Sequence, residues 1–211
     1  MNINPHAKRI LCFGDSNTYG TIPYPFAGAR KERYTIDKRW TGIIQKLLWD
    51  WYDIIEEWRW WRTIYVAWTS GDQTKKWDLF LEWLLASHIP LDLVIVMLWN
   101  NDIKESLWLS PQEICDMMEQ YIIPQIKTKN IPLLLISPPP IIDGLRENFP
   151  AGSNNKITEL NRLYKQLSMK YDFYYLDIQS QLSCGSDGVH LTETSHQLFW
   201  EQVAEKIKEI L

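Results

Sequence analysis

The chain has 211 residues, of which 45% are hydrophobic, and a formal net charge of -4 at pH 7. This length and composition predict one domain with a sizeable core over residues 1–211, and leave too little chain for two ordinary domains. The sequence contains no run of Lys and Arg of the kind that follows a phosphate backbone, which argues against nucleic acid as a partner.

Neither targeting segments nor cysteine motifs are evident. The N-terminal segment MNINPHAKRILCFG lacks the long apolar region and small-residue cleavage site of a signal peptide, and no later segment offers the ~18 consecutive apolar residues of a transmembrane helix. Cys12, Cys115 and Cys184 match neither a disulfide framework nor a CxxC motif. We therefore expect a soluble, cytoplasmic protein with three reduced cysteines, Cys12 in the core.

Short apolar runs predict five strands, at residues 9–13, 52–55, 91–98, 132–137 and 173–176. The third and fourth runs are apolar throughout, as in strands buried on both faces of a sheet. Helical patterns separate them: apolar residues recur at helical spacing in 160–167 and 199–210. The segment Ser110-Pro111-Gln112-Glu113 has the residues of a helix start, so a helix is expected from there towards Thr128.

Alternating strands and helices predict an α/β fold with a parallel sheet of about five strands and helices on both faces. The simplest such arrangement is a flavodoxin-like three-layer α/β/α sandwich. Residues 138–156 form one long irregular segment, which we expect to make a wall of a site.

Polar segments follow the first and third predicted strands, at Gly14-Asp15-Ser16 and Asn100-Asn101-Asp102, and Asp187-Gly188-Val189-His190 comes near the end of the chain. Reactive groups collect at the C-terminal ends of parallel strands. A serine hydroxyl needs a base to take its proton, and a histidine base needs a carboxylate to orient it. Each segment alone is more often a turn, a loop or a surface histidine. Their order and placement together predict a Ser-His-Asp site.

The same segments resemble a known family. ILCFGDSNTYG resembles the first signature block of GDSL/SGNH hydrolases, VIVMLWNNDIK the block that supplies an oxyanion-hole Asn, and DGVHLT the block with Asp and His. RWTG, IIEE, PLDLVIVML and SPPP resemble the arylesterase/acyltransferase branch, which acts on short-chain esters. The resemblance implies a single SGNH hydrolase domain with a small-molecule ester as substrate.

By this resemblance Ser16 is the nucleophile, His190 the general base and then acid, and Asp187 its orienting carboxylate. The implied oxyanion hole consists of the backbone N–H groups of Ser16 and Trp61 and the side chain of Asn101. The reaction passes through an acyl-serine intermediate with no cofactor or metal. Water then gives hydrolysis and an alcohol gives acyl transfer. Both a monomer and a homo-oligomer stay open.

Asp15 and Asp102 lie next to these residues. Either could be mistaken for a catalytic acid, but we expect both to brace loops by accepting backbone hydrogen bonds. His6, His88 and His196 show no metal-ligand spacing with one another.

Tryptophan is unusually abundant. The chain has 12 Trp and nine Gly, whereas average glycine usage of about 7% predicts roughly 15 Gly. Trp40 in RWTG stands at an expected position. Eleven others stand where glycine or a small residue is expected: Trp49, Trp51, Trp58, Trp60, Trp61, Trp68, Trp77, Trp83, Trp99, Trp108 and Trp200.

We hypothesise that a TGA codon read as glycine in the source has been translated as tryptophan. A naturally Trp-rich surface is the alternative. Overpacking of about 1–3 kcal/mol at each of the eleven sites could together cost roughly 11–33 kcal/mol, against a domain stability of about 5–15 kcal/mol, which favours the first interpretation.

The leading function is a serine ester hydrolase or acyltransferase that acts on short acyl groups, such as acetyl, carried by small alcohols, aryl alcohols or sugars. One alternative is a catalytically silent SGNH-fold binding protein whose acyl pocket is blocked by Trp61 and Trp99. Another is a flavin- or phosphate-binding module, suggested by fold analogy and the turn over residues 14–20.

Overall fold

The computed structural model describes residues 4–24, 32–64, 78–98 and 100–211. At its centre lies a parallel five-stranded sheet in the order β2-β1-β3-β4-β5. The strands are β1 (Lys8–Gly14), β2 (Tyr52–Trp58), β3 (Leu93–Met97), β4 (Leu133–Ile136) and β5 (Tyr174–Leu176). Each coincides with a predicted strand, and the strand order confirms the flavodoxin-like α/β fold.

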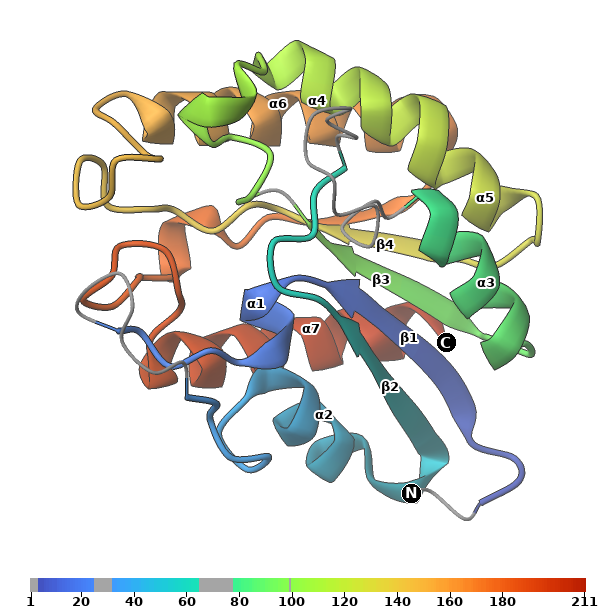
Figure 1. The fold of residues 1–211 in the computed structure, drawn as a ribbon. Helices are drawn as coiled ribbons and strands as arrows, with labels where there is room; N and C mark the ends of the chain where they lie inside the picture. The colour runs from blue at the N-terminus through green and yellow to red at the C-terminus, as the bar shows by residue number, and fades with distance from the viewer. Residues whose placement is uncertain (1–3, 25–31, 65–77, 99) are drawn as a thin grey trace.

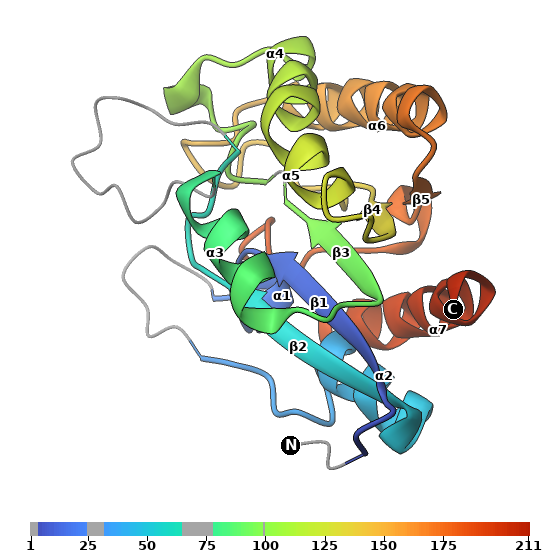
Figure 2. The same ribbon diagram turned by 90° about the vertical axis from the view of Figure 1, so that its right-hand side faces the viewer.

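Helices cover both faces of this sheet (Figures 1 and 2). One layer contains α3 (Asp78–His88), α4 (Pro111–Met117), α5 (Ile123–Lys127) and α6 (Ser153–Tyr171), and the other contains α2 (Trp40–Leu48) and α7 (Glu193–Ile210). A short helix, α1 (Ser16–Tyr19), lies at the C-terminal end of β1. The described residues also contain single turns of 3-10 helix: η1 (Trp49–Trp51), η3 (Glu105–Leu107) and η5 (Gln179–Gln181). The predicted three-layer sandwich is confirmed.

The helix predicted from Ser110 begins there. The Ser110 side chain accepts a hydrogen bond from the Glu113 N–H, and the Glu113 carboxylate accepts one from the Ser110 N–H at 2.8 Å. The helix continues through a π-helical turn, η4 (Met118–Ile122), into α5. Because Pro124 has no N–H and its ring crowds the preceding turn, the wider turn precedes it.

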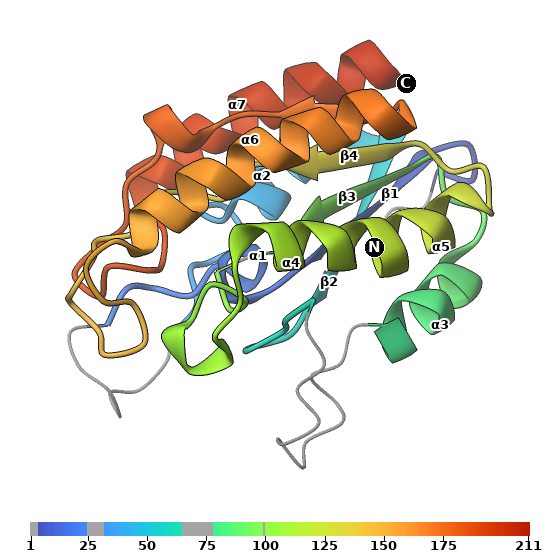
Figure 3. The same ribbon diagram turned by 90° about the horizontal axis from the view of Figure 1, so that it is seen from above.

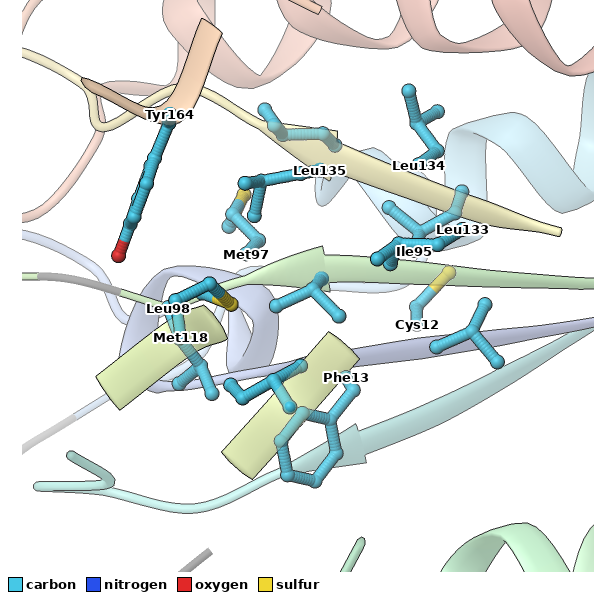
Figure 4. Packing of buried hydrophobic residues seen from close by; sticks show 14 of the residues in the cluster. Cys12, Phe13, Ile95, Met97, Leu98, Met118, Leu133, Leu134, Leu135 and Tyr164 are labelled. Carbon is cyan, nitrogen blue, oxygen red and sulfur yellow. The ribbon is translucent and has the colours of Figure 1, made fainter. Parts of the chain in front are cut away.

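A continuous core lies between the layers. Every residue of β3 and β4 is buried, as their apolar sequences predict. Figure 4 shows side chains of the sheet packed together with Met118 and with Tyr164 of α6. Cys12 lies in this core, and Trp40 packs fully buried against Phe199, with ring centroids 5.1 Å apart. This packing gives the loops beyond the strands a rigid base.

The edge strand β2 runs three residues past the predicted end at residue 55. Its extension contains Glu56, whose carboxylate pairs with Arg39 at 2.7 Å and with Arg33 at 2.7 Å. The two arginines compensate the negative charge of Glu56. The strand was predicted from apolar residues alone, and a glutamate does not fit that pattern.

The loops that follow the strands gather at one end of the sheet, beyond the arrowheads in Figures 1 and 3. The three polar segments singled out in the sequence lie in these loops. Within the described parts of the chain, no helix is both long and apolar enough to cross a membrane.

Candidate active site

Ser16 is placed by a tight turn between β1 and α1. Asp15 caps the helix, its Oδ1 accepting the Asn17 N–H at 2.9 Å. A Cβ atom on Gly14 would lie 1.9 Å from Thr18 Oγ1 and 2.9 Å from a backbone carbonyl oxygen of β3. Glycine at position 14 therefore allows the chain to turn this closely and leaves Ser16 at the first position of α1.

A second turn places His190. Gly188 has φ 72°, a conformation that glycine adopts without strain. Asp187 Oδ1 accepts the N–H groups of Val189 at 3.0 Å and of His190 at 2.9 Å. One oxygen of the Asp187 carboxylate thus stabilises the loop that carries His190, and the other oxygen stays available to the imidazole.

The structure joins the three predicted triad residues in one hydrogen-bonded chain. The Oγ of Ser16 lies 3.0 Å from His190 Nε2, and His190 Nδ1 lies 2.6 Å from Asp187 Oδ2. A carboxylate can only accept, so the Nδ1 proton faces Asp187 and, in the neutral ring, Nε2 is free to accept the serine proton. This is the arrangement by which an imidazole activates a hydroxyl.

Asp187 is held in its ionised form. Burial raises the pKa of this carboxyl, but the hydrogen bonds and the charge of His190, together with backbone N–H groups, outweigh burial and lower the pKa to about 2. Its Oδ2 also accepts the Tyr24 N–H at 3.2 Å and lies 3.5 Å from Arg146 Nη2. At neutral pH the group beside His190 is therefore a carboxylate.

Asn101 is oriented by two partners. Its Nδ2 donates to the Arg62 carbonyl oxygen at 3.0 Å, and its Oδ1 accepts from Lys104 Nζ at 2.7 Å. Since an ammonium group can only donate, Lys104 fixes which end of the amide is oxygen. The NH₂ end then lies on the side of β1 and the Ser16 turn, where Asp15 Oδ2 is 3.5 Å away.

A cavity of about 50 Å³ lies over these residues. Its described lining includes Ser16, Trp61, Asn101 and His190, so the structure brings the predicted nucleophile, its base and the predicted oxyanion groups to one place. Trp99 lies outside the described residues. The predicted irregular segment ends earlier than expected, because α6 begins at Ser153 rather than after residue 156. Its irregular part, residues 138–152, contributes three further lining residues, which confirms it as a wall of the site: Arg146, Asn148 and Phe149.

The two neighbouring carboxylates brace loops, as predicted. Asp15 caps α1, and Asp102 Oδ1 accepts the Ile64 N–H at 2.7 Å. Burial raises the pKa of Asp15 to about 6, although the Asn17 N–H and nearby cations act against this rise.

Sequence reasoning missed three residues of the site. Asn17 Oδ1 accepts the Leu191 N–H at 3.0 Å and so ties α1 to the His190 loop. Lys104 orients Asn101, and Arg146 donates from Nε to the Asp187 carbonyl oxygen at 2.9 Å. The position of Asn17 directly after Ser16 was a signal that could have found it. Lys104 contacts Asn101 within an irregular turn, and Arg146 contacts Asp187 across 41 residues. The sequence has no pattern that predicts either contact.

Comparison with known proteins places the chain in a family. The sequence model of the GDSL-like lipase/acylhydrolase family matches residues 12–198. An aryl esterase structure from M. smegmatis is 33% identical, covers 97% of this chain and 100% of its own, and has a TM-score of 0.87. A carbohydrate acetylesterase structure from Sinorhizobium meliloti is 31% identical over 97% of this chain and 100% of its own, with a TM-score of 0.85.

A more distant structure, a lipase/acylhydrolase from Enterococcus faecalis, is 18% identical over 96% of each chain with a TM-score of 0.68, and supports the fold alone. No curated protein sequence matches the chain. The family match and the esterase structures do not favour the silent binding protein or the flavin module. The chain belongs to the GDSL-like lipase/acylhydrolase family, with the SGNH hydrolase fold, and is a carboxylic ester hydrolase.

Proposed function

We propose that Ser16 is the nucleophile of a short-chain esterase. His190 takes the serine proton as Oγ attacks the ester carbonyl carbon, and Asp187 stabilises the imidazolium that forms. His190 then gives this proton to the departing alcohol, which leaves an acyl group on Ser16. The observation that carries the proposal is the hydrogen-bonded chain of these three side chains, of which Ser16 and His190 line the cavity.

The developing oxyanion is assigned to the backbone N–H groups of Ser16 and Trp61 and to the side chain of Asn101. Donors that are fixed before the reaction stabilise the transition state without reorganisation. The contact of Lys104 with Oδ1 of Asn101 supports this assignment, because it prevents the amide from turning its oxygen towards the anion.

The small cavity favours a short acyl group such as acetyl. Its volume between the described walls is about 50 Å³. The aryl esterase and the carbohydrate acetylesterase among the similar structures support aryl alcohols or sugars as the alcohol part. Water or a second alcohol resolves the acyl-serine, so the proposal covers both hydrolysis and acyl transfer.

We further propose that residues 1–211 act as a single SGNH domain in the cytoplasm, as a monomer or homo-oligomer, with no cofactor and no nucleic-acid partner. The three free cysteines and the net charge of -4 support this assignment.

The test is hydrolysis of a short aryl acetate by the purified chain, with and without an added primary alcohol. Ser16→Ala should abolish release of the aryl alcohol, while Ser87→Ala, an exposed serine of α3, should not change it. Formation of the new ester when the alcohol is present would establish acyl transfer. Full activity in Ser16→Ala would refute the proposal.

A further inference from the structure

Tryptophan accounts for three of the five described non-glycine residues whose backbone has a positive φ. Five non-glycine residues in the described ranges have positive φ: Trp49, Trp61, Trp108, Asn130 and Asp172. Asn and Asp enter this left-handed region more readily than other residues because their short polar side chains hydrogen-bond locally. A bulky aromatic residue there is an outlier. Three tryptophans among five such residues indicate that these positions were built for another residue.

The three tryptophans lie in local structures that normally use glycine. Trp49 ends α2 with φ 55° and ψ -145°, close to a region that is essentially confined to glycine. Trp108 follows η3 with φ 55° and ψ 21°, the left-handed conformation in which glycine commonly terminates a helix.

Trp61 lies in a turn of four residues that is closed by the Arg62 N–H donating to the Arg59 carbonyl oxygen at 3.3 Å. It is the third residue of this turn and has φ 64°. Turns with positive φ at the third position, as in type II, use glycine or asparagine there.

Trp49 and Trp108 are largely exposed and pack little against the fold, whereas Trp61 is less exposed and contacts Lys104. Their exposed fractions are 69% for Trp49, 42% for Trp61 and 82% for Trp108. The overpacking expected from the sequence is therefore wrong at positions 49 and 108, because indoles as exposed as these crowd little. The conflict lies in the backbone. Trp40, the one tryptophan expected from its motif, is fully buried.

Position 61 also belongs to the site. Trp61 lines the cavity beside Ser16 and Asn101, and Lys104 Nζ lies 3.8 Å from the centre of an indole ring. Glycine at this position would remove the indole wall while the main-chain N–H of the proposed oxyanion hole stays in place.

We infer that positions 49, 61 and 108 are glycine positions of this fold, and that the residue at position 61 determines which esters the site accepts. Tryptophan at 61 restricts the cavity to small esters, and glycine opens it to larger acyl or alcohol groups. The second part of the inference rests on the proposed function, whereas the first part does not.

The first test compares glycine with alanine at the same position. Alanine shares the penalty of positive φ and glycine does not, so Trp61→Gly should melt about 2–8 °C above Trp61→Ala, and the pair at position 49 should behave alike. The control is Trp83, which is 77% exposed within α3. There helix propensity reverses the order, and Trp83→Ala should melt about 1–4 °C above Trp83→Gly. An alanine variant at 61 that melts at or above the glycine variant overturns the inference.

The second test measures two series of esters: aryl esters with acyl chains from acetate to hexanoate, and acetates of phenol and 2-naphthol. Trp61→Gly should raise kcat/KM for the larger member relative to the smaller by about tenfold or more in at least one series, and Trp83→Gly should leave both ratios unchanged. Unchanged ratios in Trp61→Gly would overturn the specificity role. Activity that survives Ser16→Ala would instead refute the proposed function, and the melting comparison would stand unaffected.

Discussion

Replacing Asp187 with Asn tests whether Asp187 orients the His190 base, because the substitution keeps the shape of the side chain and changes its hydrogen bonding. Asn has nearly the same shape, but its NH₂ group can donate to His190 Nδ1, which moves the ring proton to Nε2, the atom 3.0 Å from Ser16 Oγ. The base then cannot accept the serine proton. The expected loss in kcat is roughly 10⁴-fold, the size found when Asn replaces the triad carboxylate of serine proteases.

The same substitution has a predictable effect on stability. The pKa of Asp187 falls from 3.8 to about 2 on folding, and this difference of about 1.8 corresponds to about 2.5 kcal/mol. Since the folded pKa lies below the unfolded one, this contribution is present above about pH 4 and is lost as the pH falls through about 2. Asp187→Asn should therefore lower the melting temperature at pH 7 by up to about 5–10 °C, with the difference disappearing near pH 2.

Both effects can be measured with aryl acetate hydrolysis and thermal denaturation over pH 2–8. Asp177→Asn is the matched control, because this exposed carboxylate also accepts a backbone N–H two residues ahead, that of Gln179 at 3.1 Å, but lies outside the cavity lining. It should keep full activity. A kcat within tenfold of wild type in Asp187→Asn would show that Asp187 does not orient the base.

Two further substitutions test the surroundings of Ser16. Asn101→Ala should lower kcat by about 10²–10³-fold through loss of an oxyanion donor, while Asn100→Ala, beside it in the cavity lining, should have a much smaller effect; equal losses in steady-state kinetics would contradict the assignment. Gly14→Ala should lower the free energy of unfolding by about 1–3 kcal/mol, because the new Cβ would lie 2.9 Å from the Met97 carbonyl oxygen. An unchanged urea midpoint would show that the turn has room for a side chain.

The strands and a helix start could be predicted from the sequence, because the residue patterns that indicate them lie within short segments. Apolar runs located the five strands, and the capping residues at Ser110 located a helix start. What the sequence could not predict depends on contacts between distant segments. Glu56, in the extension of β2, pairs with Arg33 and Arg39 from other segments, and Arg146 meets Asp187 across 41 residues.

The tryptophan positions likewise needed both the sequence and the structure. Counting residues identified an excess of Trp and a deficit of Gly, but only backbone torsions distinguish positions that require glycine from those that tolerate tryptophan. The TGA hypothesis stays a prediction. It is best supported at positions 49, 61 and 108, where the backbone has a positive φ. Sequencing of the coding DNA should find TGA at these codons, and ordinary TGG there would contradict it.

The proposed activity depends most directly on Ser16 being the nucleophile that His190 activates. The decisive measurement is mass spectrometry of the intact protein and its peptides after brief reaction with a small fluorophosphonate. We expect one adduct, on the peptide that contains Ser16, with no adduct in Ser16→Ala and slow labelling in His190→Ala. An adduct on another residue, or equal labelling of Ser16→Ala, would contradict this expectation.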